Sequence, residues 1–175
     1  AMGLSLVVGL AICDALEELY ALEAEVKWPN DIYLNGKKIA GILVELEGHS
    51  YETSHAVIGV GLNVQMPQHV AGNIDQPWTD IASQQIEGCD RNELVANLIK
   101  SLTNRLKIHT ESGLDTMLNE WQQKDYFYGK MVSVIAGDNT RYGISRGVNQ
   151  QGALLLEIDG KVEPIYGGEI SLRPA

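Results

Sequence analysis

Residues 31–46, with the sequence DIYLNGKKIAGILVEL, decide the fold of the first part of the chain. Two β-forming runs flank Asn35-Gly36, a dipeptide that favours the type I′ turn of a tight hairpin. A further β-forming run covers residues 55–63. Its central part, VIGVGL at 57–62, is apolar at every position, which predicts a strand in the sheet centre that is covered on both faces.

Helices are predicted both before and after these strands in the sequence. Apolar residues between Leu4 and Tyr20 recur at helical spacing, which indicates a buried helix that begins almost at residue 1. Asp90, with Glu93 three positions later, has the spacing of a capping box and starts an amphipathic helix, and a second follows from about 113 to 124. Because a domain seldom opens on its core helix, we expect the chain to be part of a longer protein.

Residues 65–89 are rich in turn formers and indicate a long loop, a kind of segment that is usually functional or mobile. After Tyr128-Gly129, five short β-forming runs follow within about 45 residues, separated by Gly, Asn and Asp. This spacing predicts a small SH3-like barrel. The expected fold class is α+β: a mixed sheet with flanking helices over residues 1–126, then the barrel over residues 127–175.

Composition excludes several classes of protein. The chain has 13 Lys and Arg against 23 Asp and Glu, and its net charge of −10 argues against nucleic-acid binding. The apolar stretch 3–13 is about half a membrane span and lacks a basic leader. Cys13 and Cys89 are too few for a disulfide framework and show no metal-ligand spacing. We expect a soluble, reduced, cytoplasmic protein without a covalent nucleophile.

The sequence KWPND at residues 27–31 is the densest group of functional side chains. Asp31 could hold Mg²⁺, and Lys27 or Asn30 could contact a phosphate. The alternative is a strand end followed by a turn, with Trp28 in the core and Lys27 solvated.

Interior glycines mark two neighbouring strands. Glycine weakens a strand unless a ligand or another backbone approaches closely, so Gly41, Gly59 and Gly61 predict the floor of a groove for a flat ligand. For any one of them the alternative is a β-bulge or tight packing. Asn63 ends the second strand and could serve a metal or a base, or could simply end the strand.

Three motifs in this order and spacing closely resemble biotin–protein ligases: KWPND at 27–31, KIAGILVE at 38–45 and GVGLN at 59–63. The segments GISRG at 143–147, GALLLE at 152–157 and GGEISL at 167–172 resemble the C-terminal domain of the bacterial ligase that is also the biotin operon repressor. The resemblance runs from about residue 3 to 173. It implies part of a class II synthetase-like catalytic domain followed by the barrel.

The resemblance implies an ATP-dependent ligase that acts in two steps. Biotin and MgATP would form biotinyl-5′-adenylate, and a lysine of the biotin carboxyl carrier protein of acetyl-CoA carboxylase would then take up the biotinyl group. ATP, Mg²⁺ and biotin are the small molecules expected, and a second copy of the chain is an expected partner.

The resemblance also implies roles for residues. Lys38 is the expected catalytic lysine, beside the biotin carboxylate. The expected biotin cleft consists of Lys38, Gly41, Leu43, Gly59, Gly61 and Leu62. The expected adenylate contacts are Lys27, Asn30, Asp31, Asn63, Met66, Ile74, Trp78 and Arg173, with Glu169 as a further candidate. Asp31 and Asn63 are the expected metal ligands.

Two parts of the family pattern have no counterpart in this sequence. The arginine-rich loop that wraps the adenylate and the winged helix–turn–helix that binds DNA are expected upstream of Ala1, so that DNA binding would belong to the longer parent alone. Two alternatives stay open: a binding or dimerising module without turnover, and a related lipoate ligase.

Overall fold

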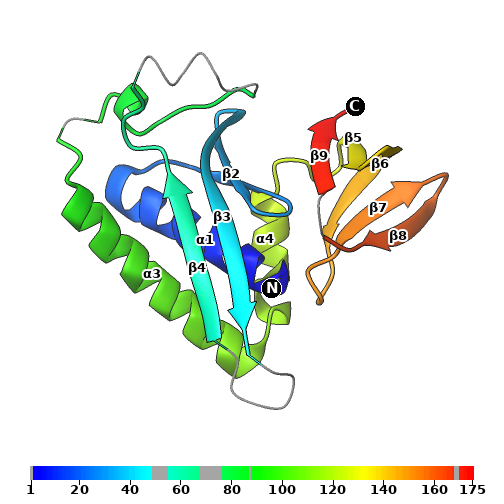
Figure 1. Cartoon of the computed structure of the whole chain (residues 1–175), viewed down its shortest axis with the longest axis horizontal. Coiled ribbons are helices and arrows are strands. Elements are labelled where there is room, and N and C mark those ends of the chain that lie inside the picture. The colour runs from blue at the N-terminus through cyan, green and yellow to red at the C-terminus, as the bar shows by residue number, and fades with distance from the viewer. Residues whose placement is uncertain (1, 49–54, 68–75, 87, 168–169) are drawn as a thin grey trace.

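Two antiparallel sheets organise the computed structural model, which describes residues 2–48, 55–67, 76–86, 88–167 and 170–175 (Figure 1). The first sheet has the order β1 (Glu25–Lys27), β2 (Asp31–Leu34), β3 (Lys37–Glu47) and β4 (His55–Leu62). The helices are α1 (Met2–Tyr20), α3 (Arg91–Ser112) and α4 (Leu118–Lys124), with single 3₁₀ turns η1 (Ala82–Gln84) and η2 (Asp115–Met117).

The predicted hairpin joins β2 to β3. Asn35 and Gly36 have φ values of 51° and 74°, as a type I′ turn requires. The prediction of a mixed sheet is wrong for the described strands, since every pair in both sheets is antiparallel. Consecutive strands joined by short connections can pair only in this way, and parallel pairing is limited to isolated bridges.

The prediction that residues 57–62 are covered on both faces is also wrong. Among the described strands, β4 lies at the edge of its sheet. Ile58 and Val60 are half-buried toward the core, whereas Gly59 and Gly61 on the other face are exposed. An apolar run that contains glycines cannot by itself reveal whether a second layer covers it.

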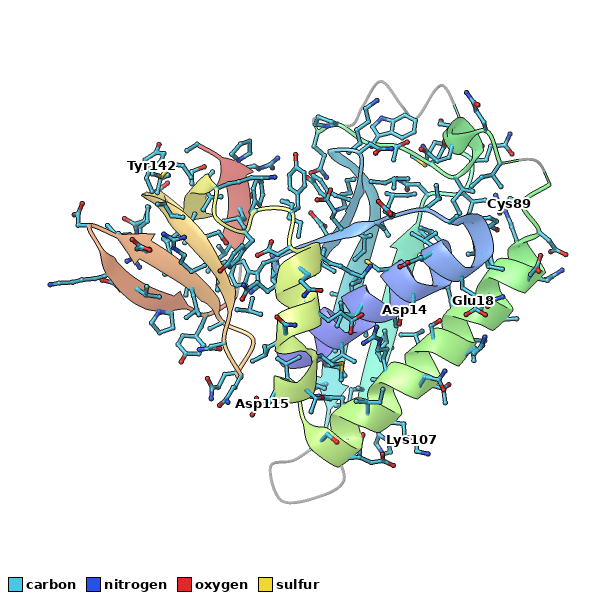
Figure 2. All side chains as sticks on the ribbon, turned by 180° about the vertical axis from the view of Figure 1, so that it is seen from behind. Asp14, Glu18, Cys89, Lys107, Asp115 and Tyr142 are labelled. Carbon is cyan, nitrogen blue, oxygen red and sulfur yellow. The ribbon has the colours of Figure 1, made fainter. Side chains whose placement is uncertain are left out.

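The three α-helices of the described residues lie on one side of the first sheet, and Figure 2 shows them together from behind. The predicted first helix is confirmed, with its apolar side chains from Leu6 to Leu16 almost fully buried. Asp90 is confirmed as the N-cap of α3, because its Oδ1 accepts a hydrogen bond of 2.8 Å from the Asn92 amide. None of the described helices has the length and apolar character needed to cross a membrane.

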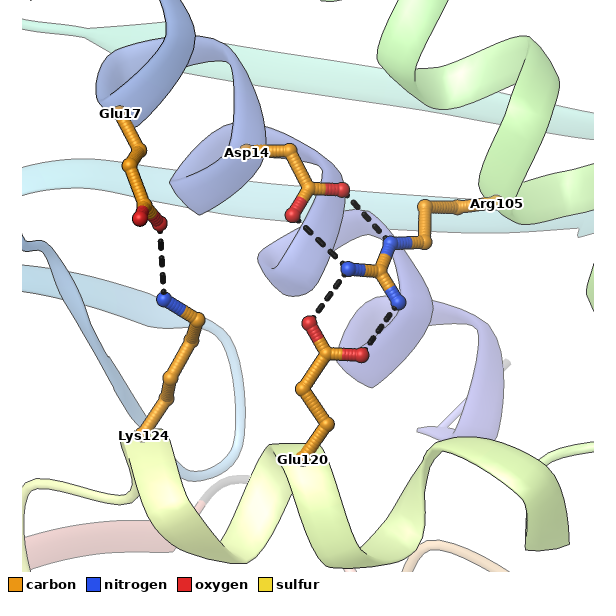
Figure 3. A network of polar contacts seen from close by, with 5 residues as sticks. All are labelled: Asp14, Glu17, Arg105, Glu120 and Lys124. Carbon is orange, nitrogen blue, oxygen red and sulfur yellow. Dashed lines mark hydrogen bonds and ion pairs between the residues drawn. The ribbon is translucent and has the colours of Figure 1, made fainter.

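An ion network centred on Arg105 joins the three helices (Figure 3). The guanidinium of Arg105 on α3 binds Asp14 of α1 through two hydrogen bonds of 2.6 and 2.8 Å. It also binds Glu120 of α4 through two of 2.6 and 2.5 Å. These hydrogen bonds raise the pKa of Arg105, so the cation is permanent and fixes the relative position of the helices.

The second sheet contains β5 (Met131–Ala136), β6 (Asn139–Val148), β7 (Leu154–Ile158), β8 (Lys161–Ile165) and β9 (Ile170–Pro174), in the order β8-β7-β6-β5-β9. All five predicted runs form strands, whereas closure into an SH3-like barrel stays a prediction. Buried residues of this sheet, such as Leu154, belong to the same apolar cluster as Trp28 and Leu10 of the first part. The two sheets therefore share a continuous core.

Candidate functional site

A groove lies on the open face of the first sheet, opposite the helices. The strand register aligns Asp31 with Gly41, Gly41 with Gly61, and Leu43 with Gly59. The groove has a volume of about 480 Å³. It is lined by Asn30, Asp31, Lys38, Gly41, Ile42, Leu43, Gly59, Val60 and Gly61.

Asp31 lies between two lysines at one end of this groove. Its Oδ1 is 2.5 Å from Lys38 Nζ, and its Oδ2 is 3.1 Å from Lys27 Nζ. Lys27 is only 6% exposed and lies 5.1 Å from the centre of the Tyr33 ring, whereas Lys38 is 27% exposed. The cluster carries one net positive charge on an acidic chain, and Lys38 presents it to the groove.

Gly41 keeps space beside the Lys38 ammonium. A Cβ at this position would lie 3.4 Å from both Cε and Nζ of Lys38, and 3.8 Å from Asp31 Oδ1. Across the strands, a Cβ on Gly59 would face the Leu43 carbonyl oxygen at 3.6 Å. The bare floor therefore exposes main chain, and Leu43 supplies apolar surface, since 61% of it is exposed.

The turn 27–31 is fastened to β3 by Asn30. The Asn30 side-chain amide donates to the Ile42 carbonyl oxygen at 2.8 Å, and the Ile42 amide donates to the Asn30 carbonyl oxygen at 2.9 Å. Trp28 is fully buried, as the alternative interpretation of this motif expects, but the expectation that Lys27 is solvated is wrong, because Lys27 is only 6% exposed. One donor of Asn30 Nδ2 thus serves the backbone, and the residue lines the groove.

The second half of the 65–89 loop returns to the site. Lys38 donates its amide to Pro77 O at 3.0 Å, and Thr79 donates to Lys38 O at 2.9 Å, so Trp78 pairs with Lys38 in a parallel bridge. Asn63 Nδ2 donates to the Thr79 carbonyl oxygen at 3.0 Å. The structure therefore brings Trp78 and Asn63 to the Lys38 end of β3.

Asp80 is a functional candidate that the sequence analysis missed. This buried carboxylate accepts hydrogen bonds from the Met66 amide at 2.7 Å and the Ser83 amide at 2.9 Å, and from the Ser83 hydroxyl. Burial pushes the pKa of Asp80 upward, but these hydrogen bonds outweigh it and lower the pKa below its usual value. Asp80 therefore holds both ends of the loop. The sequence signal that could have revealed Asp80 is its spacing from Ser83, an Asp-x-x-Ser pattern that is typical of the start of a helical turn.

Other predicted residues lie away from the groove. Leu62 lines a separate apolar groove between β4 and α3, together with Met66. Arg173 is exposed on β9, and its Nε donates to Ser171 Oγ at 2.9 Å. Ile74 and Glu169 lie outside the described residues.

Tyr33 connects Arg173 electrostatically to the site. Burial and the charge of Asp31 raise the pKa of Tyr33, while the cations Lys38 and Arg173 act in the opposite direction. Arg173 thus lies within electrostatic reach of the strand that carries Asp31.

The residues present do not fit a resident Mg²⁺ at Asp31 and Asn63. Both carboxylate oxygens of Asp31 are paired with ammonium groups, which compete with a cation. Within the described part of the chain, His, Cys, Asp and Glu nowhere form a group of three that could hold a metal. We therefore derive no step through a metal at these residues.

The cluster can hold two anionic groups side by side. Lys38 offers a positive charge over a floor without side chains, and this favours contact between two groups that would otherwise repel each other. Burial raises the pKa of the Cys13 thiol to about 12, which makes Cys13 a poor nucleophile.

Two family patterns cover most of these elements. Residues 1–63, which include the Lys27–Lys38 cluster, match the biotin/lipoate A/B protein ligase family. Residues 127–173 match the biotin protein ligase C-terminal domain. Together they define the class: a biotin/lipoate-type ligase with a C-terminal β-domain.

Comparison with individual relatives shows which family within this class the chain belongs to. The chain is 45% identical over its whole length to the bifunctional ligase/repressor BirA of Escherichia coli K12 and covers 54% of that protein. It is 30% identical to the biotin--[acetyl-CoA-carboxylase] ligase of Paracoccus denitrificans, covering 94% of this chain and 73% of the relative. The chain belongs to the biotin protein ligase family, as its motifs indicate, although it spans about half the length of its bifunctional relatives.

A solved structure supports the fold. The biotin protein ligase of Aquifex aeolicus in complex with biotin and ATP superposes with a TM-score of 0.85 at 27% identity. The similarity covers all of this chain and 72% of the other.

Proposed function

We propose that this chain carries the acid-activating site of a biotin--[acetyl-CoA-carboxylase] ligase. The observation that carries the proposal is the Lys38 ammonium, held by Asp31 over the glycine floor of the groove. The proposal also draws on the family membership and on the Aquifex relative, whose complex contains biotin and ATP.

In the first step, a biotin carboxylate oxygen attacks the α-phosphorus of ATP. A new phosphorus–oxygen bond forms, the bond from the α-phosphorus to the bridging oxygen breaks, and pyrophosphate leaves with the electron pair. Lys38 holds the carboxylate and the phosphate together and offsets their repulsion. Gly41, Gly59, Gly61 and Leu43 provide the surface for the uncharged rings and apolar tail of biotin.

In the second step, the ε-amine of a lysine on the biotin carboxyl carrier protein attacks the acyl carbon of biotinyl-5′-adenylate. A carbon–nitrogen bond forms, the bond between that carbon and the phosphate oxygen breaks, and AMP leaves as the amine loses a proton. The nucleophile belongs to the carrier, and the proposal assigns no nucleophile to this chain.

The proposal includes further expectations. Mg²⁺ accompanies ATP, residues 1–126 form the partial catalytic domain, and residues 127–175 form a C-terminal domain whose sheet closes as an SH3-like barrel. The protein is cytoplasmic, and a second copy pairs with it at the β3–β4 region. Exposed Leu46 and Val57 provide apolar surface there.

A lipoate ligase is the second candidate, because the family pattern that covers residues 1–63 includes both activities. Calorimetric titration of the 175-residue chain with non-hydrolysable analogues of biotinyl- and lipoyl-adenylate separates the two. We expect selective binding of the biotinyl compound. Selective binding of the lipoyl compound would contradict the proposal.

A second measurement separates turnover from mere binding. Biotin-dependent release of pyrophosphate from ATP is followed in the full-length protein, with Lys38→Ala and its exposed neighbour Lys37→Ala as a matched pair. We expect Lys38→Ala to lower the rate at least about 100-fold with an unchanged melting temperature, and Lys37→Ala to leave it unchanged. Equal rates for the two variants would refute the role of Lys38, and no release by the wild type would favour a module without turnover.

A further inference from the structure

We infer that the turn 149–152 of the second sheet positions the site turn 27–31 through the indole of Trp28. This inference rests on the proposed function, and it makes Trp28 and Asn149 positioning residues for the turn that carries Lys27, Asn30 and Asp31, the expected adenylate contacts. Neither Trp28 nor Asn149 touches the groove itself.

The link is a single buried hydrogen bond. Trp28 Nε1 donates to the Gly152 carbonyl oxygen at 3.0 Å, across 124 residues of sequence. Trp28 has no exposed surface, and Gly152 is buried as well. A buried indole N–H that loses its acceptor cannot turn to water instead, so this bond fixes the orientation of the ring.

Asn149 fixes the acceptor side. Its Oδ1 accepts hydrogen bonds from the Gln151 amide at 3.0 Å and the Ala153 amide at 2.9 Å. The Gly152 amide donates to the Asn149 carbonyl oxygen at 2.9 Å, and Gly152 adopts a φ of 81°, which favours glycine. The carbonyl that receives the indole is therefore set by the Asn149 side chain.

The turn 27–31, on the other side of this hydrogen bond, is also held in place. The neighbours of Trp28 in sequence are Lys27, which pairs with Asp31, and the Pro29–Asn30 segment, which is fastened to Ile42. The turn therefore has one anchor in β3 and one in the second sheet. Loss of the second anchor would leave the turn held from one side, and Asp31, which positions Lys38, lies at its end.

Trp121 provides an internal control for the indole. It is also buried, at 1% exposure, but its Nε1 has no hydrogen-bond partner among the described residues. Trp28→Phe and Trp121→Phe thus remove the same atoms from the core, and only the first removes a hydrogen bond. Gln150→Ala is the control for Asn149→Ala, because Gln150 lies in the same turn and instead contacts Asp115 at 2.9 Å.

Amide hydrogen exchange at Ile42 reports on the turn without any need for activity, because this amide bonds to Asn30 O. We expect Trp28→Phe and Asn149→Ala to speed its exchange, and the two controls to leave it unchanged. The double variant should exchange no faster than Trp28→Phe alone, since both changes break one link. Should Trp28→Phe fail to fold, Asn149→Ala still tests the link from the other sheet.

Kinetics of pyrophosphate release in the full-length protein provide the functional readout. We expect the KM for ATP to rise about five- to tenfold in Trp28→Phe and Asn149→Ala, with the KM for biotin within about twofold of wild type. Equal effects in the controls, additive effects in the double variant, or parallel increases in both KM values would overturn the inference. If the wild type released no pyrophosphate, the proposed function would fail, whereas the exchange data would still decide whether the two sheets are linked.

Discussion

The molecule contains two ion clusters of opposite design, one on each side of the first sheet. Behind the sheet, Arg105 is a cation between the carboxylates of Asp14 and Glu120 (Figure 3). On the open face, Asp31 is a carboxylate between the ammonium groups of Lys27 and Lys38.

The two clusters differ in how completely they use their hydrogen-bonding groups. Arg105 makes four hydrogen bonds in a planar, bidentate arrangement, and it joins its own helix α3 to α1 and α4. Lys38 has one side-chain partner among the described residues, and its ammonium borders a groove. A cluster whose donors are used fixes the fold, whereas one with spare donors beside a groove can bind a ligand.

Replacing Arg105 should have the largest effect on stability. Arg105→Met leaves two carboxylates facing each other without their cation, so we expect the free energy of unfolding to fall by about 3 kcal/mol. Binding of the biotinyl-adenylate analogue should stay within about twofold. Urea unfolding measures the first quantity and calorimetry the second.

Lys107→Met is the matched control on the same helix. Lys107 is 73% exposed and its nearest carboxylate, on Glu111, is 4.0 Å away, so its loss should cost less than about 0.5 kcal/mol. Equal losses in the two variants would show that the Arg105 network does not hold the helices together.

Local signals explain why the elements were predictable. Asn35-Gly36 specifies its hairpin through backbone conformation alone, and Asp90 caps α3 through an amide two residues away. The Arg105 network was not predictable in this way, because Asp14 and Arg105 are 91 residues apart.

The site was predictable only where its residues are close in sequence. KWPND and the following strand brought Lys27, Asp31 and Lys38 together, although the pairing of Asp31 with both lysines was not part of that prediction. The link from Trp28 to Gly152 had no sequence signal, because a main-chain acceptor can come from any residue type. Whether a second layer covers the face of β4 that carries Gly59 and Gly61 depends on other elements of the fold. The sequence of the strand itself therefore does not predict the exposure of that face.

Asp125 differs from the carboxylates of both ion clusters, because it is buried without a cation in hydrogen-bonding contact. Its Oδ1 accepts from the Phe127 amide at 3.0 Å, and its Oδ2 has no partner among the described residues. Burial raises the pKa of Asp125 to about 7, against opposing effects of the Phe127 amide and Lys130. A carboxylate deprived of both water and a paired cation thus remains protonated into the neutral range.

The sign of the pH effect follows from proton binding. Between about pH 4 and 7 the folded state keeps the proton of Asp125 while the unfolded state has lost it, so stability falls as the pH rises. A pKa of about 7 in the folded state against the usual 3.8 corresponds to at most about 4 kcal/mol of that loss, fully developed at pH 8. Urea unfolding at pH 4, 6 and 8 should show a flatter profile for Asp125→Asn than for the wild type. Exposed Asp138→Asn should retain the wild-type slope, and an unchanged slope in Asp125→Asn would be inconsistent with the raised pKa.

Gly41→Ala should have the smallest effect on stability and should test the open face directly. Gly41 is not in the left-handed region, so alanine fits the strand backbone, and the free energy of unfolding should change by less than about 0.5 kcal/mol. The new methyl group would lie 3.4 Å from Lys38 Nζ, on the floor where the ligand is proposed to rest. We expect the affinity for the biotinyl-adenylate analogue to fall about tenfold, as measured by calorimetry.

Gly3→Ala on α1 is the control, since its Cβ would meet only Leu114 at an ordinary 3.7 Å. It should leave the affinity unchanged. Gly41→Ala and Arg105→Met would then show opposite patterns, one losing affinity without stability and the other stability without affinity. If Gly41→Ala instead lost stability and kept its affinity for the biotinyl-adenylate analogue, both clusters would serve the fold. The proposal that the groove is the ligand site would then be wrong.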